Sequence, residues 1–224
     1  MPPAQAACPN PYFPLEEGLK LTYRAGSSEL TISTREVAPT PEGLKGLVAV
    51  DLKGKNGQTE AFCTSEGVRT GLGGLEGTLL SASGMQVEVV SAEGVAVPPA
   101  VRMVPGASWK NSLSVKMQPP AGSKMPSGMV FASTFDKEAT VVGEEEVTVA
   151  GGTFKALKVK NTTTARASRA GSQGRSVESM IWFAPGVGIV KIATGGNTDL
   201  ELLKVERPVS VQKAPARGKK SSKL

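Results

Sequence analysis

The chain has 224 residues, enough for one all-β domain with a substantial hydrophobic core, and its composition excludes several classes of protein. It contains no histidine, so neither a Ser-His-Asp nor a Cys-His catalytic arrangement can be built. No apolar run approaches the ~18 residues needed to span a bilayer. The 26 glycines and 16 prolines exceed the usual share and indicate frequent turns.

The net charge of +6 is concentrated at the C-terminal end of the chain. Five basic residues and no acid lie between Lys213 and Leu224, and removing these five charges leaves +1 for residues 1–212. Residues 208–224 are predicted to form a disordered basic tail. Because the remainder is nearly neutral, nucleic acid is not expected as a partner, whereas the tail offers a means of attachment to an anionic surface.

Residues 1–14 are predicted to form an N-terminal arm. Ala4-Gln5-Ala6 has the small residues of a signal-peptide cleavage site, so we expect export to the periplasm or the outer membrane, with a cytoplasmic location as the alternative. Cys8 is a candidate for lipidation or for a disulfide with Cys63, and two unpaired cysteines are the third possibility. Two distant cysteines without histidine do not make a metal site.

From residue 15 to residue 207 the pattern is that of strands separated by turns, and no apolar spacing predicts a secure helix. A turn is expected at residues 54–57, because Asn56-Gly57 tolerates positive φ, and a strand follows at 59–64. The first three strands are predicted to direct the following side chains inward: Leu19, Leu21 and Tyr23; Leu30, Ile32 and Thr34; Val48, Val50 and Leu52.

Further strands are predicted along the rest of the chain, although residues 71–84 are too glycine-rich for a confident element. Residues 139–142 and 146–150 are expected to be two separate strands, and residues 164–175 an exposed basic loop containing Arg166, Arg169 and Arg175. Two leucines in succession, Leu202-Leu203, predict a bulge in the last strand.

The most strand-like runs, residues 177–183 and 187–192, are predicted to form an antiparallel hairpin. Pro185 and Gly186 between them favour a reversal of the chain. The alternation places Ile181 and Phe183 on one side of the strand and Trp182 on the other. A tryptophan on that other side requires either a second layer of structure or a ligand.

About a dozen such strands predict a single antiparallel all-β domain, a strongly curved sheet that forms a half-barrel or an open barrel, with a sandwich as the alternative. Four signatures refine this: PYFPLEEG at 11–18 leading to TYR at 22–24, PGASW at 105–109, AGGTFKALKV at 150–159 and WFAPGVGIVK at 182–191. In this order they resemble an ill-characterised group of exported bacterial β-rich proteins, often lipoproteins. Members look like relatives of the half-barrel carriers that localise lipoproteins. The resemblance implies an apolar concave face and a binding or structural role in the cell envelope, with no catalytic residues.

The expected function is therefore non-enzymatic, and no cofactor is expected. Aromatic residues make up only 4% of the chain, and Tyr23, Trp109, Trp182 and Phe183 are the sharpest binding candidates; burial in the core is the alternative for each. We expect an envelope protein that binds an apolar ligand, a lipid or a protein partner on its curved sheet. The alternative is a structural or adhesion-type protein without a ligand, attached to an anionic surface by its tail. A carrier needs an empty hollow, whereas an interaction module fills it with Trp109, Phe131 and Phe183.

Overall fold

The structure, a computed structural model, describes residue 8 and residues 10–72, 84–120, 122–123, 128–167 and 174–208. These residues form twelve strands and one short 3-10 helix, η1 (Ala100–Arg102). The strands are β1 (Lys20–Ala25), β2 (Ser28–Thr40), β3 (Gly43–Leu52), β4 (Lys55–Thr64), β5 (Gly67–Thr70), β6 (Gln86–Gly94), β7 (Ser108–Gln118), β8 (Phe131–Val149), β9 (Gly152–Ala167), β10 (Arg175–Ala184), β11 (Gly188–Thr194) and β12 (Asn197–Glu206).

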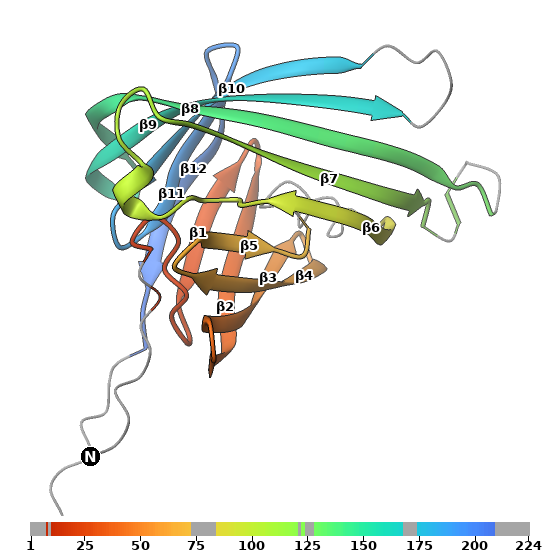
Figure 1. The fold of residues 1–224 in the computed structure, drawn as a ribbon, viewed down its shortest axis with the longest axis horizontal. Helices are drawn as coiled ribbons and strands as arrows, with labels where there is room; N and C mark the ends of the chain where they lie inside the picture. The colour runs from red at the N-terminus through yellow and green to blue at the C-terminus, as the bar shows by residue number, and fades with distance from the viewer. Residues whose placement is uncertain are drawn as a thin grey trace, which may run out of the picture.

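All twelve strands belong to one antiparallel sheet in the order β5-β4-β3-β2-β1-β12-β11-β10-β9-β8-β7-β6. Consecutive strands lie side by side, except for β5 and β6, which form the two edges of the sheet. In addition, β1 pairs with β12 and so joins the two ends of the chain. The sheet curls until its edges approach each other (Figure 1), and the amide of Val68 donates to the carbonyl of Val97 at 2.8 Å. The predicted all-β fold is confirmed as a nearly closed, barrel-like sheet.

The hairpin predicted around residues 177–194 is present as β10 and β11, with Ile181 opposite Ile192. Gly186 in its turn has a φ of 77°, a conformation that glycine adopts without steric cost. The bulge predicted at Leu202-Leu203 is also confirmed. Thr22 of β1 pairs with Lys204 while Tyr23 pairs with Leu202, which leaves Leu203 as the extra residue.

The turn predicted at residues 54–57 is wrong by two residues, because Leu52 pairs with Lys55 and the turn spans residues 52–55. Lys53 and Gly54 form the turn, with φ of 55° and 77°, and Asn56 and Gly57 lie inside β4. Positive φ at both central residues is what a tight hairpin turn requires. The carboxylate of Asp51 accepts from the Gly54 amide at 3.2 Å and so stabilises the turn at this position.

The two strands predicted at 139–142 and 146–150 are a single long strand, β8, and this prediction is also wrong. The register of β8 against β9 passes from Val141–Val159 to Gly143–Lys158, so Val142 is the extra residue of a bulge. A bulge bends a strand without ending it. The predicted basic loop is likewise shorter, because β9 continues to Ala167 and β10 begins at Arg175; Arg169 lies outside the described residues.

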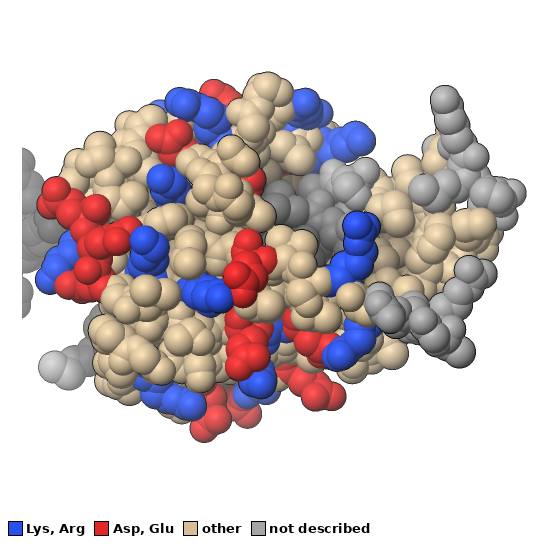
Figure 2. All heavy atoms as spheres, turned by 90° about the horizontal axis from the view of Figure 1, so that it is seen from above, with Lys and Arg blue, Asp and Glu red and all other residues tan. Residues whose placement is uncertain are grey.

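Many charged side chains on the outside of the sheet form ion pairs. Figure 2 shows acidic and basic side chains intermixed over the visible face. Ion pairs cross neighbouring strands from β7 to β10: Lys110–Glu138 at 3.3 Å, Lys158–Glu145 at 3.3 Å, Lys160–Glu178 at 2.7 Å, and Arg166–Asp136. Exposed pairs of this kind each contribute only about 0–1 kcal/mol to stability, so apolar burial determines the fold.

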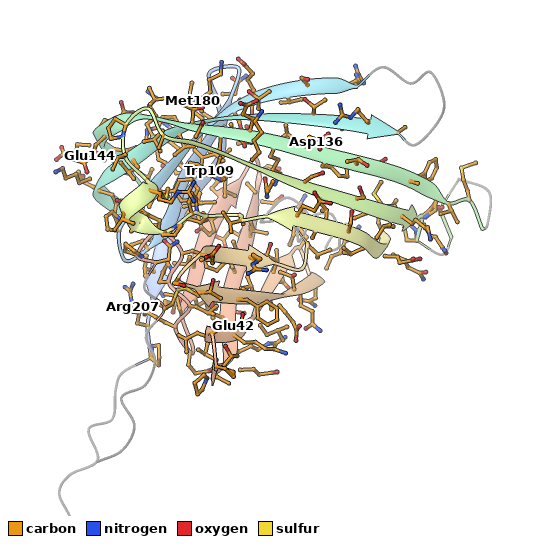
Figure 3. All side chains as sticks on the ribbon, viewed as in Figure 1. Glu42, Trp109, Asp136, Glu144, Met180 and Arg207 are labelled. Atoms are coloured by element: carbon orange, nitrogen blue, oxygen red, sulfur yellow. A yellow bond between two sulfur atoms is a disulfide. The ribbon has the colours of Figure 1, made fainter. Side chains whose placement is uncertain are left out.

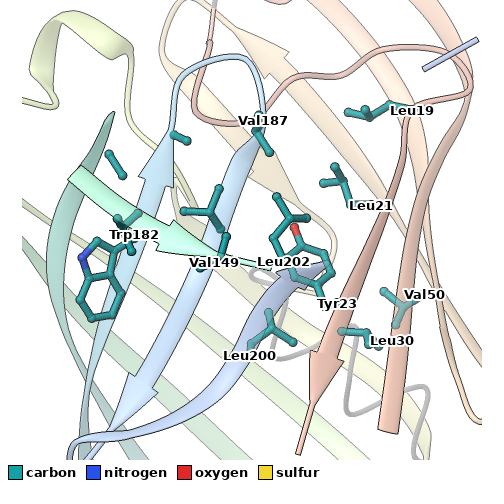
Figure 4. Close-up of a cluster of buried hydrophobic side chains, with 14 residues drawn as sticks. Leu19, Leu21, Tyr23, Leu30, Val50, Val149, Trp182, Val187, Leu200 and Leu202 are labelled. Atoms are coloured by element: carbon teal, nitrogen blue, oxygen red, sulfur yellow. The ribbon is translucent and has the colours of Figure 1, made fainter. Parts of the chain in front are cut away.

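The hairpin of β8 and β9 bends back over its neighbours at the end marked by Glu144 (Figure 3). The amide of Gly151 at its tip donates to the carbonyl of Leu202 in β12 at 2.8 Å, and the amide of Ala150 donates to the Glu201 carboxylate at 3.0 Å. This bend adds a second layer beside β10–β12. It also places Val149 in one apolar cluster with Trp182 and Leu202 (Figure 4).

Buried apolar side chains form two large clusters and one small one. The first cluster contains Tyr23, Trp182 and the tip of the β8–β9 hairpin, and the second contains Ile181 and Phe183 with residues of β3, β4, β8 and β9. Successive residues of β10 therefore pack into different clusters, as the alternation predicts. The small cluster joins β7 with residues of β6 and β8.

Candidate functional site

Two cavities of about 80 Å³ each lie inside the curled sheet. The first is lined by β1–β5 together with residues 187–189, and the second by β7–β11 together with Ala96 and Val97. Phe13 and Ile189 line both, so the two cavities meet at these side chains. We call the two cavities together the hollow. Because strands from opposite parts of the sheet line each cavity, the hollow is the interior of the curl.

The wall of the first cavity is apolar except for a group of threonines. Leu21, Ile32 and Val48 provide apolar surface. Three buried threonines from β2, β4 and β5 line the same space: Thr34, Thr59 and Thr70. Thr34 and Thr59 both pair with Val48 and so lie on either side of it, one on each neighbouring strand.

The hydroxyl of Thr70 is the one buried side-chain polar atom without a hydrogen-bond partner among the residues that the structure describes. A buried hydroxyl in this condition costs on the order of 1–3 kcal/mol. Since Thr70 lines the first cavity, this oxygen is positioned to bond a polar group that enters it.

The second cavity carries aromatic and polar side chains on one wall. Trp109 and Phe183 contribute rings, and Asn161 contributes an amide that is only 5% exposed. The Asn161 amide donates to the hydroxyl of Thr163 at 3.1 Å and to that of Ser179 at 3.5 Å. Lys137 is the one charged residue among the described residues that line either cavity.

The N-terminal arm lies across the hollow and is attached to the sheet at three points. Cys8 forms a disulfide with Cys63 of β4. The side-chain amide of Asn10, itself 2% exposed, donates to the carbonyl of Pro98 at 2.7 Å. The amide of Gly186 donates to the carbonyl of Pro11 at 2.8 Å. These attachments hold the following residues, Tyr12–Pro14, against the cavities.

Tyr12 and Phe13 are the aromatic residues of this arm. Burial raises the pKa of the Tyr12 phenol, and the negative charge of Glu144 adds to the effect. Phe13 takes part in both cavities, between β1–β5 on one side and β7–β11 on the other. The arm therefore fills the middle of the hollow with an aromatic side chain.

Three of the four predicted binding residues line the hollow. Tyr23 faces the first cavity, and its hydroxyl donates to the carbonyl of Ile189 at 2.8 Å; burial raises the pKa of this phenol well above its ordinary value. Trp109, on the first part of β7 (Figure 3), and Phe183 both face the second cavity. Phe131 lies at the start of β8, where it is 37% exposed, and does not line the hollow.

Trp182, the fourth predicted residue, lies in the first apolar cluster and lines neither cavity. Its indole N–H donates to the carboxylate of Glu145 at 2.7 Å. The ammonium groups of Lys158 and Lys191 lie 5.3 and 5.1 Å from the ring centroid, within cation–π range. The hydrogen bond from Trp182 is the main cause that lowers the pKa of Glu145, and Lys158 adds to it. A second layer thus covers this tryptophan, one of the two possibilities that the alternation allows.

Phe13, Lys137 and Thr70 are hollow residues that the sequence analysis missed. A signal existed for Lys137, because it is in phase with Ala139 and Val141, the buried residues of the same strand. Phe13 precedes the first strand and has no periodic pattern that could place it. The missing partner of Thr70 depends on side chains far away in the sequence.

No group of three or more His, Cys, Asp or Glu side chains that could hold a metal ion occurs among the described residues. Within the same residues, no helix is long and apolar enough to cross a membrane.

Together, the single curled sheet and its apolar interior define an all-β protein of the barrel-like class. The family model described as DUF3108-like matches residues 44–194, and the chain belongs to this family. This agrees with the group of exported β-rich proteins that the four sequence signatures resemble. No curated protein matches the chain.

Three solved bacterial structures are similar to this chain. A proposed exported protein with a YmcC-like fold from Bacteroides fragilis is 16% identical, with a TM-score of 0.61, covering 91% of this chain and 100% of that one. A proposed lipoprotein from Parabacteroides distasonis is 14% identical, with a TM-score of 0.52, covering 88% of this chain and 99% of that one. The hypothetical lipoprotein YmcC from Escherichia coli is 10% identical, with a TM-score of 0.42, covering 86% and 85%. At these identities the first two similarities show the fold alone.

Proposed function

We propose that this protein is a non-enzymatic protein of the cell envelope that binds an apolar ligand inside the hollow. The observation that supports this most strongly is the pair of cavities that meet at Phe13 and Ile189 within one curled sheet. Apolar side chains dominate their walls, and the few polar groups are convergent, the composition of a ligand pocket. The ligand is a small apolar molecule rather than a protein, because sheet and arm enclose the space from several sides.

Location in the envelope has two supports. The B. fragilis and P. distasonis structures are described as an exported protein and a lipoprotein, and this chain shares their fold. The Cys8–Cys63 disulfide belongs to the kind of bond that persists in oxidising compartments such as the bacterial periplasm. Lipidation of Cys8, the other expectation for this residue, would use the same sulfur atom, so a Cys8 that forms the disulfide is not lipidated.

Phe13 occupies the place that the ligand takes. Each cavity, at about 80 Å³, is smaller than the ~150 Å³ cavity known to bind benzene. A chain-like ligand therefore needs the two cavities joined, and withdrawal of the Phe13 ring joins them. The arm that carries this ring lies outside the strands of the sheet, so its movement breaks few sheet hydrogen bonds.

The cost of this withdrawal sets the size of the effect to be measured. Returning a fully buried phenylalanine to water costs ~1.5–3 kcal/mol, and Phe13 is partly buried, so its withdrawal costs on the order of 1–2 kcal/mol, a roughly 5- to 30-fold loss of apparent affinity. In a Phe13→Ala variant no ring has to be withdrawn before binding, so this variant is expected to bind an apolar probe more tightly than the wild type by a factor in this range.

The test is titration of the wild-type protein and of Phe13→Ala with the neutral fluorescent probe N-phenyl-1-naphthylamine. The matched control is Phe154→Ala, because Phe154 packs against the first apolar cluster and lines neither cavity. The proposal predicts tighter binding by Phe13→Ala and unchanged binding by Phe154→Ala. Absence of binding by both the wild type and Phe13→Ala, with both folded by circular dichroism, would overturn it.

The alternative function, attachment to an anionic surface without a ligand, depends on the basic tail. Residues 209–224 lie outside the described residues, and no described feature favours this alternative.

A further inference from the structure

We infer that the ligand of the hollow has an uncharged polar end with a hydroxyl group, and that Thr70 binds this hydroxyl in the first cavity. The inference rests on the proposed function and adds the chemical class of the ligand. Three observations support it: a buried hydroxyl without a partner, a second threonine on the next strand, and a wall whose described residues carry no charge.

Thr70 is the last residue of β5 and faces the interior of the sheet. It is 7% exposed and lines the first cavity. It pairs with Ala61 of β4, and the amide of Gly71 donates to the carbonyl of Glu60 at 2.9 Å, so backbone contacts on β4 fix its position. Its hydroxyl has no hydrogen-bond partner within the part of the chain that the structure describes. A ligand oxygen that accepts from this hydroxyl therefore relieves an unfavourable burial.

Thr59 lies on β4, two positions before Ala61 on the same inward face, and also lines the first cavity. Residues placed diagonally across two antiparallel strands are about 7–8 Å apart, a distance that two hydrogen bonds through one shared oxygen nearly span. The Thr59 hydroxyl donates to the carbonyl of Glu60 at 3.3 Å, so its oxygen acts as an acceptor toward a ligand. A ligand hydroxyl can accept from Thr70 and donate to Thr59, whereas an ether or ester oxygen can make only the first of these bonds.

The first cavity disfavours an ionised head group. None of the described residues on its wall is charged, and burial of an ion without an opposite charge costs much more free energy than burial of a hydrogen-bonded hydroxyl. Tyr23, which lines this cavity, shows the same effect: burial raises the pKa of its phenol well above the ordinary value, because the anionic form is disfavoured there. A carboxylate or a phosphate is subject to the same penalty.

This placement of the hydroxyl also orients the rest of the ligand. The hydrocarbon chain lies against Leu21 and then passes Ile189, which lines both cavities. In the second cavity, Ile181 and Phe183 offer apolar surface to its far end. A long-chain alcohol and an acylglycerol both supply a hydroxyl at the end of such a chain.

The experiment is competition against N-phenyl-1-naphthylamine at pH 8 with three ligands of equal chain length: 1-dodecanol, 1-monolauroylglycerol and laurate. The variants are Thr70→Val, which removes the hydroxyl and keeps the shape of the side chain, and Thr70→Ser, which keeps the hydroxyl. Thr148→Val is the matched control, because Thr148 is exposed, lines neither cavity and shares its hydrogen bond with Thr153 at 3.0 Å.

The wild type, Thr70→Ser and Thr148→Val are expected to bind the two uncharged ligands more tightly than laurate. Thr70→Val should bind the uncharged ligands about tenfold more weakly than the wild type, the effect of one lost hydrogen bond, while its affinity for the probe stays the same. A purely structural role of Thr70 would change the affinities for the probe and for the ligands alike. The tighter of 1-dodecanol and 1-monolauroylglycerol identifies the source of the hydroxyl.

Equal binding of the uncharged ligands by the wild type and by Thr70→Val, or tighter binding of laurate than of either uncharged ligand by the wild type, would overturn this inference and leave the proposed function standing. Failure of the probe and of all three ligands to bind, in every folded variant including Thr70→Ser, would overturn the proposed function as well.

Discussion

The disulfide between Cys8 and Cys63 is predicted to stabilise the protein strongly. It closes a chain segment with a sequence separation of 55 residues and attaches the N-terminal arm to β4. The loop-closure entropy of a segment of this length corresponds to about 4 kcal/mol at 25 °C. The perturbation is Cys8→Ala, which removes the cross-link and leaves Cys63 as a small buried side chain.

Urea unfolding at pH 7, followed by tryptophan fluorescence and by far-ultraviolet circular dichroism, measures this stabilisation. The free energy of unfolding of Cys8→Ala is expected to lie about 4 kcal/mol below that of the wild type. Added dithiothreitol should lower the wild type to the same value and leave Cys8→Ala unchanged. A difference of less than about 1 kcal/mol would refute the reasoning, because the arm would then be held without the cross-link.

Three further predictions concern single positions. Glu145→Gln should lower the melting temperature at pH 7. The pKa of Glu145 is below its ordinary value, so its charged form stabilises the fold above about pH 4.5. The difference in melting temperature from the wild type should shrink as the pH falls through the lowered pKa. Thr70→Val should raise the free energy of unfolding by about 1 kcal/mol, because it removes a buried hydroxyl without a partner; a loss of stability in urea would contradict this. Gly67→Ala should lower the free energy of unfolding by on the order of 2 kcal/mol, since φ is 121° and a Cβ would lie 2.6 Å from a backbone oxygen of the opposite edge. Gly54→Ala is the control, because Gly54 has a positive φ but free space around it, so this variant measures the contribution of φ alone.

Local patterns predicted much of the sheet. The alternation in residues 177–183 placed Ile181 and Phe183 on one side and Trp182 on the other, and the structure agrees. The doubled leucine before Lys204 predicted the bulge that the register of β1 with β12 shows. These features depend on neighbouring residues, and the period of two in a strand records them directly.

Features that depend on distant contacts were not predictable in this way. Residues 139–142 and 146–150 were predicted as two strands, but the pairing of β8 with β9 continues on both sides of a bulge at Val142 and makes them one strand. The inward positions of Val48, Val50 and Thr59 fix the register of β3 with β4. This register places the turn at Lys53-Gly54.

The candidate site also contains residues that strand periodicity predicts and residues that it does not predict. Strand periodicity placed Tyr23 and Phe183 inward, and both line the hollow. Phe13 reaches the hollow only because Cys8, Asn10 and Pro11 hold the arm to residues far away in the sequence. Such contacts follow from the closure of the sheet and leave no periodic signal.

The four isoleucines of the chain allow the most direct measurement of ligand binding in the hollow. Ile32, Ile181, Ile189 and Ile192 all line one cavity or both. Isoleucine δ1-methyl NMR spectra, recorded while 1-dodecanol is added to the labelled protein, therefore report on the hollow alone. Shifts of the Ile189 methyl and of isoleucine methyls in both cavities are predicted. A spectrum in which no isoleucine methyl moves at saturating 1-dodecanol would contradict binding inside the sheet.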